Sequence, residues 1–378
     1  MKKSPKILQL VSVRWWNASA YYGIILAKAL GMIKIPTIVA GRKDSPPIEK
    51  AKKFLLPINT KINLESINPF TCLKNYSSIK HLLVSEKINL INSHRPEDHI
   101  YGAISKFALK PYIPLIRTVS DVRSPKTNII NHWLHKYGTD FFVFSCKKSF
   151  DRYQSVWPIF ENKHIVIHSA IDTTYFHPQN VKNNLRKKFS VSDDEILIGI
   201  IARLSPVKDH ETFLKAALKV HQEYSNVRFL ISGEESQITH NDLKKLANQL
   251  GIFKKIIFLH RDDKIDVRDL INSLDIGVVA SNGSEVICRI SVEFMAMQKP
   301  QVTTDINVLP EIIEEGKNGF VVHAKNHEAM ADKLLVMVRN TELRKQMGVN
   351  AMEIAEAKYS LPVFAEKTIE TYRKVLNL

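Results

Sequence analysis

Two carboxylates, Glu285 and Glu293, stand eight positions apart in a segment that runs from a predicted loop into a predicted helix. Glu285 belongs to the loop, and the helical pattern of Ile290, Phe294 and Met297 puts Glu293 inside the second turn. Free N–H groups at a helix start favour a phosphate, and carboxylates accept hydrogen bonds from sugar hydroxyls. The pair therefore suggests a site for a nucleotide-sugar. Two solvated glutamates on a surface helix are the alternative.

Two cations precede this pair in the chain. Arg203 follows the predicted strand 196–202, and Lys208 stands five residues later, where a helix is predicted to begin. An arginine can bind a diphosphate through two hydrogen bonds, and a lysine can add a second charge from another side. A lysine at a helix start opposes the helix dipole, so an anionic ligand explains it better than an ordinary surface charge does.

Short β-branched runs alternate with amphipathic stretches of helix length in both halves of the chain. This alternation predicts an α/β protein with parallel sheets covered on both faces. The polar stretch 177–194 separates two such series, which predicts two Rossmann-like, doubly wound domains facing a cleft. The predicted strands are 6–13, 35–40, 89–93, 114–119, 141–144 and 164–168, then 196–202, 227–231, 256–259, 275–280, 301–303 and 319–322; the predicted helices include 19–31, 72–86, 98–109, 147–154 and 361–378.

The 378 residues are 44% hydrophobic, which is enough for two domains with separate cores. Residues 1–180 hold 26 basic and 11 acidic residues, a net +15, whereas residues 181–378 hold 28 and 27, a net +1. The first half is therefore expected to meet an anionic partner: an acidic membrane surface, a phosphorylated acceptor or nucleic acid. A lysine-rich composition that only aids solubility is the alternative. Nucleic acid is the least expected partner, because zinc-finger spacing and RNP-like strands are missing from the sequence.

Three cysteines, Cys72, Cys146 and Cys288, show no CxxC or Cys/His metal spacing. This usage predicts a reducing compartment and no structural zinc. The start of the chain lacks a signal-peptide pattern, and no 18-residue apolar run occurs in the sequence. We expect a soluble, cytoplasmic protein.

Five segments of the second half stand together in a recognisable order. They are Gly199–Lys208, Leu230–Gly233, the Glu285/Glu293 pair, Glu293–Pro300 and Pro310–Phe320. Their order and spacing resemble the donor domain of GT-B-fold, retaining glycosyltransferases of family 4, the glycosyl transferases group 1, clearly over about residues 195–335. The resemblance implies a nucleotide-diphosphate sugar as donor, with a UDP-sugar expected, and neither metal nor cofactor. It also implies an acceptor-binding domain over 1–178, a donor-binding domain over 179–355 and a C-terminal helix, 356–378, that crosses back to the first domain.

The resemblance also implies roles for the residues of the donor domain. Arg203 and Lys208 would hold the donor's phosphates, Glu293 would accept from the ribose hydroxyls, and Glu285 would face the transferred sugar. Gly233 ends its strand where backbone would pass close to the nucleotide, or is simply a turn glycine.

The loop after Glu285 departs from the family pattern, which has glycines there. Val286, Ile287, Cys288 and Arg289 make this donor-binding loop bulkier, and Asp209 replaces another common glycine. Arg289 could add a cation beside the phosphates or be a solvated helix residue. Cys288 fits a small buried residue better than a nucleophile, because no histidine stands near it in the sequence.

The first half resembles the acceptor domain of this family more loosely. His94 and Asp121 follow predicted strands and are candidates to activate or orient the acceptor hydroxyl, although a lone histidine is often structural. The arginines near these strand ends suggest an acceptor that carries phosphates or carboxylates. The expected acceptor-binding residues are Arg14, Asn17, Arg95, Asp98, Arg117 and Arg123.

These observations predict a metal-independent, retaining glycosyltransferase. Its acceptor would be an acidic envelope glycan or glycolipid, since several segments are similar to family members that build lipopolysaccharide core. The basic first half would contact the cytoplasmic face of the inner membrane. A sugar-nucleotide epimerase of the same fold, a glycogen- or starch-like synthase and a non-catalytic anion- or membrane-binding protein are the alternatives.

Overall fold

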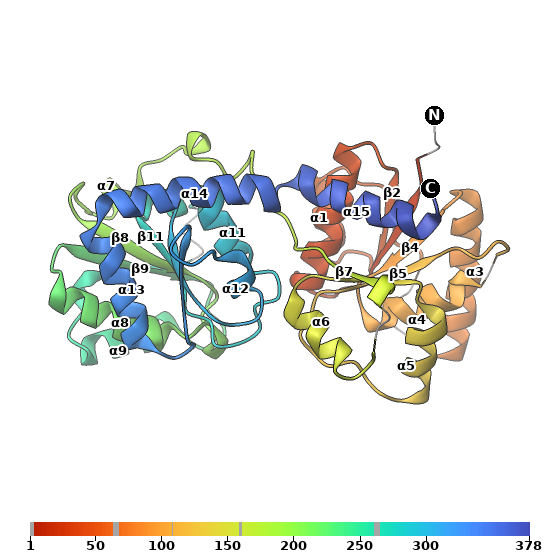
Figure 1. Ribbon diagram of the computed structural model, residues 1–378, viewed down its shortest axis with the longest axis horizontal. Helices are drawn as coiled ribbons and strands as arrows, with labels where there is room; N and C mark the ends of the chain where they lie inside the picture. The colour runs from red at the N-terminus through yellow and green to blue at the C-terminus, as the bar shows by residue number, and fades with distance from the viewer. Residues whose placement is uncertain (1–3, 63–67, 108, 159–160, 261–264) are drawn as a thin grey trace. The chain divides into compact units, whose positions relative to one another are not determined.

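The computed structural model describes residues 4–62, 68–107, 109–158, 161–260 and 265–378 of the chain. These residues form two compact units, coloured along the chain in Figure 1. The first unit comprises Met1–Ala170 and Leu361–Leu378, and the second comprises Ile171–Ser360. The chain therefore passes between the units at 170–171 and at 360–361, where the sequence predicts boundaries at 178/179 and 355/356.

The first unit contains a seven-stranded parallel sheet in the order β3-β2-β1-β4-β5-β6-β7. Strand β1 lies between β2 and β4, so all of its residues are buried, as its apolar run predicts. The strands are β1 Ile7–Val11, β2 Thr37–Gly41, β3 Ile58–Asn59, β4 Leu90–Ser93, β5 Leu115–Val119, β6 Phe141–Phe144 and β7 His164–Val166.

Asparagine side chains begin several helices of the first unit. Asn17, Asn68 and Asn128 each accept a hydrogen bond from a backbone N–H three residues on, which satisfies a donor that the helix cannot. The last helix, α15, packs against α1. The helices are α1 Ala18–Met32, α2 Pro46–Lys53, α3 Pro69–Ser85, α4 Pro96–Lys106, α5 Ile129–Trp133, α6 Lys147–Gln154 and α15 Leu361–Leu376.

The second unit contains a six-stranded parallel sheet in the order β10-β9-β8-β11-β12-β13. The sequence order changes direction between β8 and β11, which is where doubly wound sheets bind ligands at the carboxyl ends of their strands. The strands are β8 Ile196–Ile201, β9 Val227–Gly233, β10 Ile256–His260, β11 Ile276–Val279, β12 Gln301–Thr304 and β13 Gly319–Val322.

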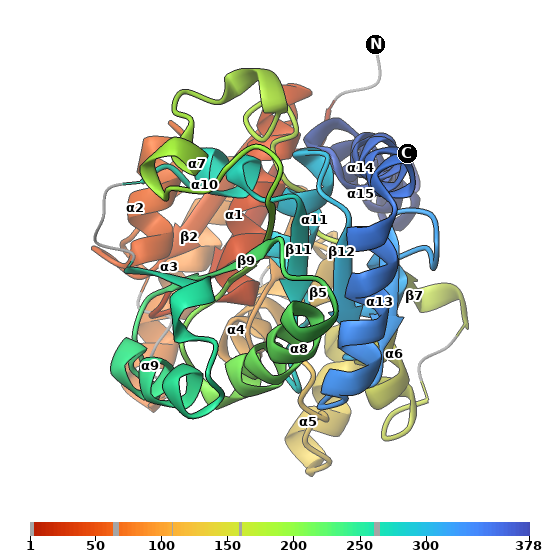
Figure 2. The same ribbon diagram turned by 90° about the vertical axis from the view of Figure 1, so that its left-hand side faces the viewer.

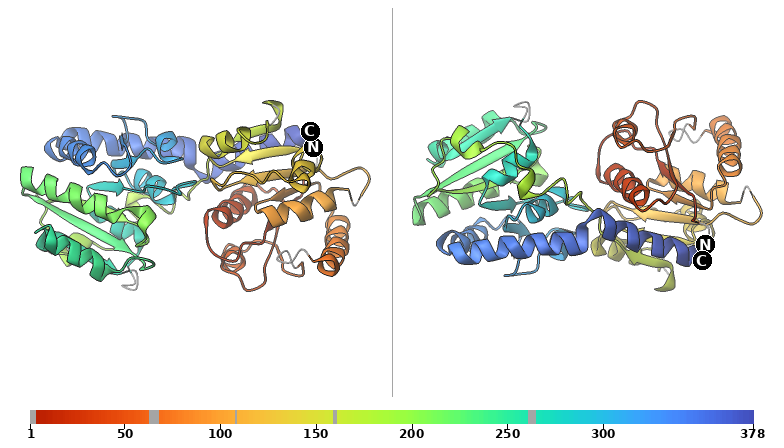
Figure 3. Two further views of the ribbon diagram at one scale, coloured as in Figure 1. Left: turned by 90° about the horizontal axis from the view of Figure 1, so that it is seen from below. Right: turned by 90° about the horizontal axis from the view of Figure 1, so that it is seen from above.

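Helices cover both faces of each sheet, as Figure 3 shows. On one face of the second sheet, α8 and α13 lie side by side (Figure 2). Phe213 of α8 and Phe229 of β9 meet edge to face in the apolar core below them. The helices of this unit are α7 Leu185–Lys188, α8 His210–Glu223, α9 His240–Gln249, α10 Val267–Ser273, α11 Arg289–Ala296, α12 Leu309–Ile312, α13 His327–Arg339 and α14 Thr341–Tyr359.

The predicted fold class is confirmed: the chain forms two Rossmann-like α/β units with parallel sheets. Among the described residues, no helix combines the length and the apolar composition that a membrane crossing requires.

Candidate functional site

The loops that follow β8 and β11 carry the predicted cations and the first glutamate. Because these strands are neighbours in the sheet, their carboxyl ends lie together. Asn282 joins the loops by two hydrogen bonds: its N–H donates to the Val207 carbonyl at 3.0 Å, and its Nδ2 donates to the Pro206 carbonyl at 3.2 Å. Pro206–Lys208 forms a short 3-10 turn, and Asp209 (φ +50°) then caps α8 by accepting from Thr212 N. The turn directs Lys208 toward the loop after β11.

Lys208 and Glu285 form a largely buried ion pair. Lys208 Nζ donates to Glu285 Oε1, and Ser281 Oγ donates to the same oxygen at 2.5 Å. The side chains are only 23% and 6% exposed, respectively. Burial by itself would lower the pKa of Lys208, but the charge of the Glu285 carboxylate and its hydrogen bond to Lys208 raise that pKa, with Arg203 opposing the rise. Lys208 is therefore a charged ammonium held beside a carboxylate, and the exposed Arg203 lies within electrostatic reach of it.

The bulky residues after Glu285 turn inward. Val286 and Ile287 are 6% and 8% exposed, and Cys288 is 6% exposed with a left-handed backbone (φ +38°) at the start of α11. Burial raises the pKa of the Cys288 thiol, so the neutral thiol is favoured and a nucleophilic thiolate is not. This environment agrees with the interpretation of Cys288 as a small buried residue.

Glu293 lies inside α11 and is 9% exposed. Burial raises the pKa of its carboxyl group, and the charge of Arg289 opposes that rise. Within the described part of the chain, no hydrogen-bond donor contacts the Glu293 carboxylate. A buried carboxylate in this state can accept hydrogen bonds from ligand hydroxyls.

Gly233 ends β9 beside the end of β8. A Cβ at this position would lie 1.8 Å from the Ala202 carbonyl oxygen, so only glycine fits without moving the neighbouring backbone. The residue that follows Ala202 is Arg203. Gly233 therefore has a packing role in placing the loop after β8, and its predicted approach to a nucleotide stays a prediction.

Ser281 and Asn282 are the residues of this cluster that sequence reasoning missed. Ser281 is 1% exposed, and its carbonyl accepts from Thr304 Oγ1 at 2.5 Å, which fixes it between β11 and β12. The sequence could have indicated them, because both residues directly follow an apolar run that ends in Ala280. Polar residues at the carboxyl end of a central parallel strand are favoured ligand contacts.

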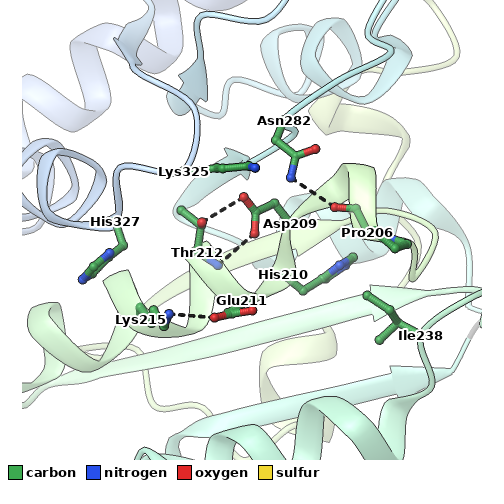
Figure 4. A pocket seen from close by; sticks show the side chains of 10 residues that line it. All are labelled: Pro206, Asp209, His210, Glu211, Thr212, Lys215, Ile238, Asn282, Lys325 and His327. Atoms are coloured by element: carbon green, nitrogen blue, oxygen red, sulfur yellow. Dashed lines mark hydrogen bonds and ion pairs between the residues drawn. The ribbon is translucent and has the colours of Figure 1, made fainter.

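A cavity of about 440 Å³ opens beside this cluster, at the start of α8 (Figure 4). Asp209, bonded to Thr212, and Asn282, bonded to Pro206, lie on its wall. None of the four predicted donor residues Arg203, Lys208, Glu285 and Glu293 lines it. Burial lowers the pKa of His210, which does line it, to about 4, so this imidazole is neutral. The candidate site is therefore the cluster around Lys208 and Glu285, and the cavity adjoins it.

In the first unit, the predicted acceptor residues near the surface already have local roles. The Asn17 side chain caps α1 by accepting from Ala20 N at 3.1 Å. The Asp121 carboxylate accepts from Arg123 N and Arg123 Nη2, both at 2.9 Å. Arg14 is exposed. A ligand of Asp121 would compete with Arg123 for this carboxylate.

Arg95 and Asp98 both hold the loop after β1. Arg95 Nη1 donates to the Ser12 carbonyl at 2.6 Å, and Arg95 Nη2 pairs with Glu97 at 3.1 Å. Asp98 is fully buried and accepts from the backbone N–H and the hydroxyl of Ser12. Burial raises the pKa of the Asp98 carboxyl to about 7, although its bonds to Ser12 oppose the rise.

His94 and Arg117 lie in the interior of the first unit, away from solvent. His94 is 1% exposed, its Nε2 lies 2.8 Å from Gln9 Oε1, and burial lowers its pKa to about 3. Arg117 is 2% exposed and donates to the Ser93 carbonyl at 3.2 Å. The predicted acceptor set therefore separates into buried residues (His94, Asp98 and Arg117) and residues at or near the surface (Arg14, Asn17, Arg95, Asp121 and Arg123).

Comparison with known proteins bears on the second unit most directly. Residues 181–354 match the model of the family described as glycosyl transferases group 1. The chain is 26% identical to spore coat protein SA of Bacillus subtilis over 231 residues, which cover 58% of this chain and 61% of that protein. It is also 26% identical to an uncharacterised glycosyltransferase of Methanocaldococcus jannaschii over 308 residues, 79% of this chain and 78% of that one.

The fold extends the similarity to both units. The structure of Anabaena HepE in complex with UDP aligns with a TM-score of 0.83 and 19% identity, and the alignment covers 98% of this chain and 100% of HepE. HepE is also known in complex with UDP-glucose. In the sequence of its second unit and in the fold of both units, this chain is therefore similar to the group 1 glycosyltransferases of GT-B fold.

Proposed function

We propose that this protein is a glycosyltransferase that moves a sugar from a nucleotide-diphosphate sugar to a hydroxyl group of an acidic acceptor. One observation carries the proposal: Lys208, Ser281 and Glu285 meet at the carboxyl ends of β8 and β11, at the start of α11. The family match spans this whole cluster.

The donor's diphosphate binds where Lys208 now pairs with Glu285. A phosphate replaces the carboxylate as the partner of Lys208, and Arg203 contributes a second cation. Glu285 is then available to accept from hydroxyls of the transferred sugar, and Glu293 accepts from the ribose hydroxyls. The two cations and the backbone N–H groups at the start of α11 stabilise the negative charge that develops on the departing diphosphate.

The donor is a UDP-sugar, which the UDP and UDP-glucose complexes of HepE support. No metal ion or cofactor takes part, because Arg203 and Lys208 supply the positive charge. The reaction retains the anomeric configuration, as in family 4: the acceptor hydroxyl attacks on the face that the diphosphate leaves, and the departing phosphate takes its proton. This route needs no carboxylate base, and Asp121, the candidate in the first unit, is engaged by Arg123.

The acceptor is an anionic glycan or glycolipid of the cell envelope, as in lipopolysaccharide core biosynthesis. The net +15 of residues 1–180 supports an anionic acceptor, and it supports contact of this half with the cytoplasmic face of the inner membrane. Nucleic acid is not a partner in this proposal.

A thermal-shift screen with UDP-, GDP- and ADP-sugars tests the donor class. A ligand that binds only the folded state raises the melting temperature, and the UDP-sugars are expected to do so. A melting temperature that no nucleotide-sugar changes would contradict the proposal. Product analysis without an acceptor separates the alternatives, because an epimerase forms the epimer of the donor sugar without an acceptor, whereas a transferase only hydrolyses the donor slowly.

A further inference from the structure

Apolar side chains gather on the surface of the first unit around α5 and the end of α4. Their exposed fractions are large for apolar residues, and no residue of α5 is buried. We name these six residues the α5 patch: Phe107 (41% exposed), Tyr112 (52%), Ile129 (84%), Ile130 (60%), Trp133 (39%) and Tyr137 (54%).

The α5 patch is continuous. The ring of Phe107 lies 5.2 Å from that of Tyr112 and 6.1 Å from that of Trp133, measured between centroids. Ile129 stands one helical turn before Trp133 on the same side of α5. Lys106 Nζ donates to the Tyr137 carbonyl at 3.2 Å, which holds Tyr137 beside the end of α4. A contiguous apolar surface of this kind marks an interaction site more often than scattered exposed residues do.

Positive charge surrounds the α5 patch. Residues 99–140 contain six Lys or Arg and two acids; Asp121 is paired with Arg123, Asp140 is paired with Lys106, and Arg117 is buried. Lys110, Lys126 and Lys136 are exposed there, and Lys136 Nζ lies 5.1 Å from the centre of the Tyr137 ring. The partner of this surface must therefore offer both apolar volume and negative charge.

An anionic lipid bilayer meets both requirements. Trp and Tyr side chains favour the headgroup region, and the negative potential of an acidic leaflet attracts Lys side chains. A second copy of this chain fits less well, because a two-fold contact would bring two lysine-rich surfaces of the same charge together. The net charge of +16 on each copy adds to that repulsion.

We propose that the α5 patch docks on the surface of an anionic bilayer. Ile129 and Ile130, the most exposed members, enter the boundary between headgroups and acyl chains, while Trp133 and Tyr137 lie at headgroup level. Lys110, Lys126 and Lys136 bind the lipid phosphates. This docking locates the membrane contact proposed above on named residues, and it does not depend on the sugar-transfer reaction.

Vesicle co-sedimentation of the full chain tests the docking. The protein is expected to bind vesicles in which about a third of the lipid is phosphatidylglycerol, to bind pure phosphatidylcholine weakly, and to be released by salt. The double variant I129S/I130S should bind the anionic vesicles at least about 10-fold more weakly, because the bilayer would no longer bury these two apolar side chains. The variant K110E/K136E should lose the preference for anionic lipid.

A matched control replaces exposed valines of the second unit. Val336 and Val349 are 45% and 41% exposed, and V336S/V349S should bind vesicles as the parent does. Unaltered vesicle binding by I129S/I130S would overturn the proposal, and so would a parent that binds neither kind of vesicle. A dimer that I129S/I130S abolishes, without vesicle binding by the parent, would assign the α5 patch to self-association instead.

Each variant is also measured for the melting-temperature shift with UDP-sugars, which reports folding and the donor site separately. If UDP-sugars raise the melting temperature of the parent but the parent does not bind vesicles, only the docking is contradicted. If the parent binds vesicles but UDP-sugars do not change its melting temperature, only the proposed function is contradicted.

Discussion

Glu285 Oε1 accepts hydrogen bonds from both Lys208 and Ser281, so this single carboxylate oxygen sets the geometry of the candidate site. In the proposed donor complex the lysine leaves this oxygen, whereas the serine can remain. We therefore predict that Ser281 is a positioning residue, which holds Glu285 in place during the proposed transfer.

Replacing Ser281 with alanine should lower kcat and leave the KM for the donor nearly unchanged. A hydrogen bond to a charged group is worth about 1.5–3 kcal/mol, which corresponds to a loss of about 10- to 100-fold if the bond acts mainly in the transition state. Ser281→Thr, which keeps the hydroxyl, should recover part of the loss. An unchanged kcat in Ser281→Ala would contradict a positioning role.

Replacing Glu293 with glutamine should weaken donor binding about 10-fold, because a neutral amide is a poorer acceptor for ribose hydroxyls than a carboxylate. The same change should raise the melting temperature at neutral pH. The pKa of Glu293 is higher in the folded state than its ordinary value of 4.5. As the pH rises above 4.5, the unfolded chain loses this proton more readily than the folded chain does, so the free energy of unfolding falls. The increase in melting temperature of Glu293→Gln should disappear below pH 4.5, where the Glu293 carboxyl group of the parent is protonated in both the folded and the unfolded state. A melting temperature lowered at neutral pH would contradict this account of Glu293.

At the scale of elements, most strands and long helices could be predicted from the sequence because buried parallel strands are apolar throughout. Strand β8, Ile196–Ile201, is an example. The two-residue strand Ile58–Asn59 could not be predicted, since it carries no pattern of its own and is formed by pairing with β2. The left-handed Asp209 stands where the family often has glycine, and aspartate tolerates that conformation better than most residues do.

The contact between Gly233 and Ala202 should make Gly233→Ala destabilising. The added Cβ would meet backbone at 1.8 Å, which cannot rotate away, so the free energy of unfolding should fall by about 1–3 kcal/mol or more. The end of β8 would move as well, and UDP-sugar binding should weaken with it. Gly283→Ala is the control, because its Cβ would meet only Val207 Cγ1 at 3.9 Å. Equal unfolding midpoints in urea for the two variants would contradict the packing role.

Asp98 links α4 to the loop after β1 and should make stability depend on pH. Its folded pKa is about 7 against an ordinary value of 3.8, so the folded state keeps a proton that the unfolded state releases. The free energy of unfolding should therefore fall as the pH rises from about 4 to about 7. Asp98→Asn should flatten this part of the profile, measured by urea unfolding across that range. A variant whose profile stays parallel to that of the parent would remove Asp98 as the cause.

At the scale of the whole molecule, two units could be predicted from the restart of the alternating pattern. The interior positions of His94 and Arg117 could not, because burial depends on partners far apart in the chain. Gln9, which contacts His94, also donates to Tyr372 of α15, 363 positions away. In the second unit, Lys208 and Glu285 stand on loops that follow β8 and β11, which are neighbours in the sheet but not in the chain. Their contact could be predicted because the family resemblance assigns both residues to one donor site.

Calorimetric titration of UDP into the parent, Lys208→Met and Lys219→Met tests the central claim most directly. Lys208 is expected to contact the diphosphate, so its replacement should weaken UDP binding by at least about 10-fold. Lys219 of α8 is also a lysine in an ion pair, with Glu328 at 2.6 Å, but it lines neither the cluster nor the cavity beside it, so its replacement should leave UDP affinity unchanged. Parent-like UDP affinity in Lys208→Met would contradict a diphosphate site at the carboxyl ends of β8 and β11.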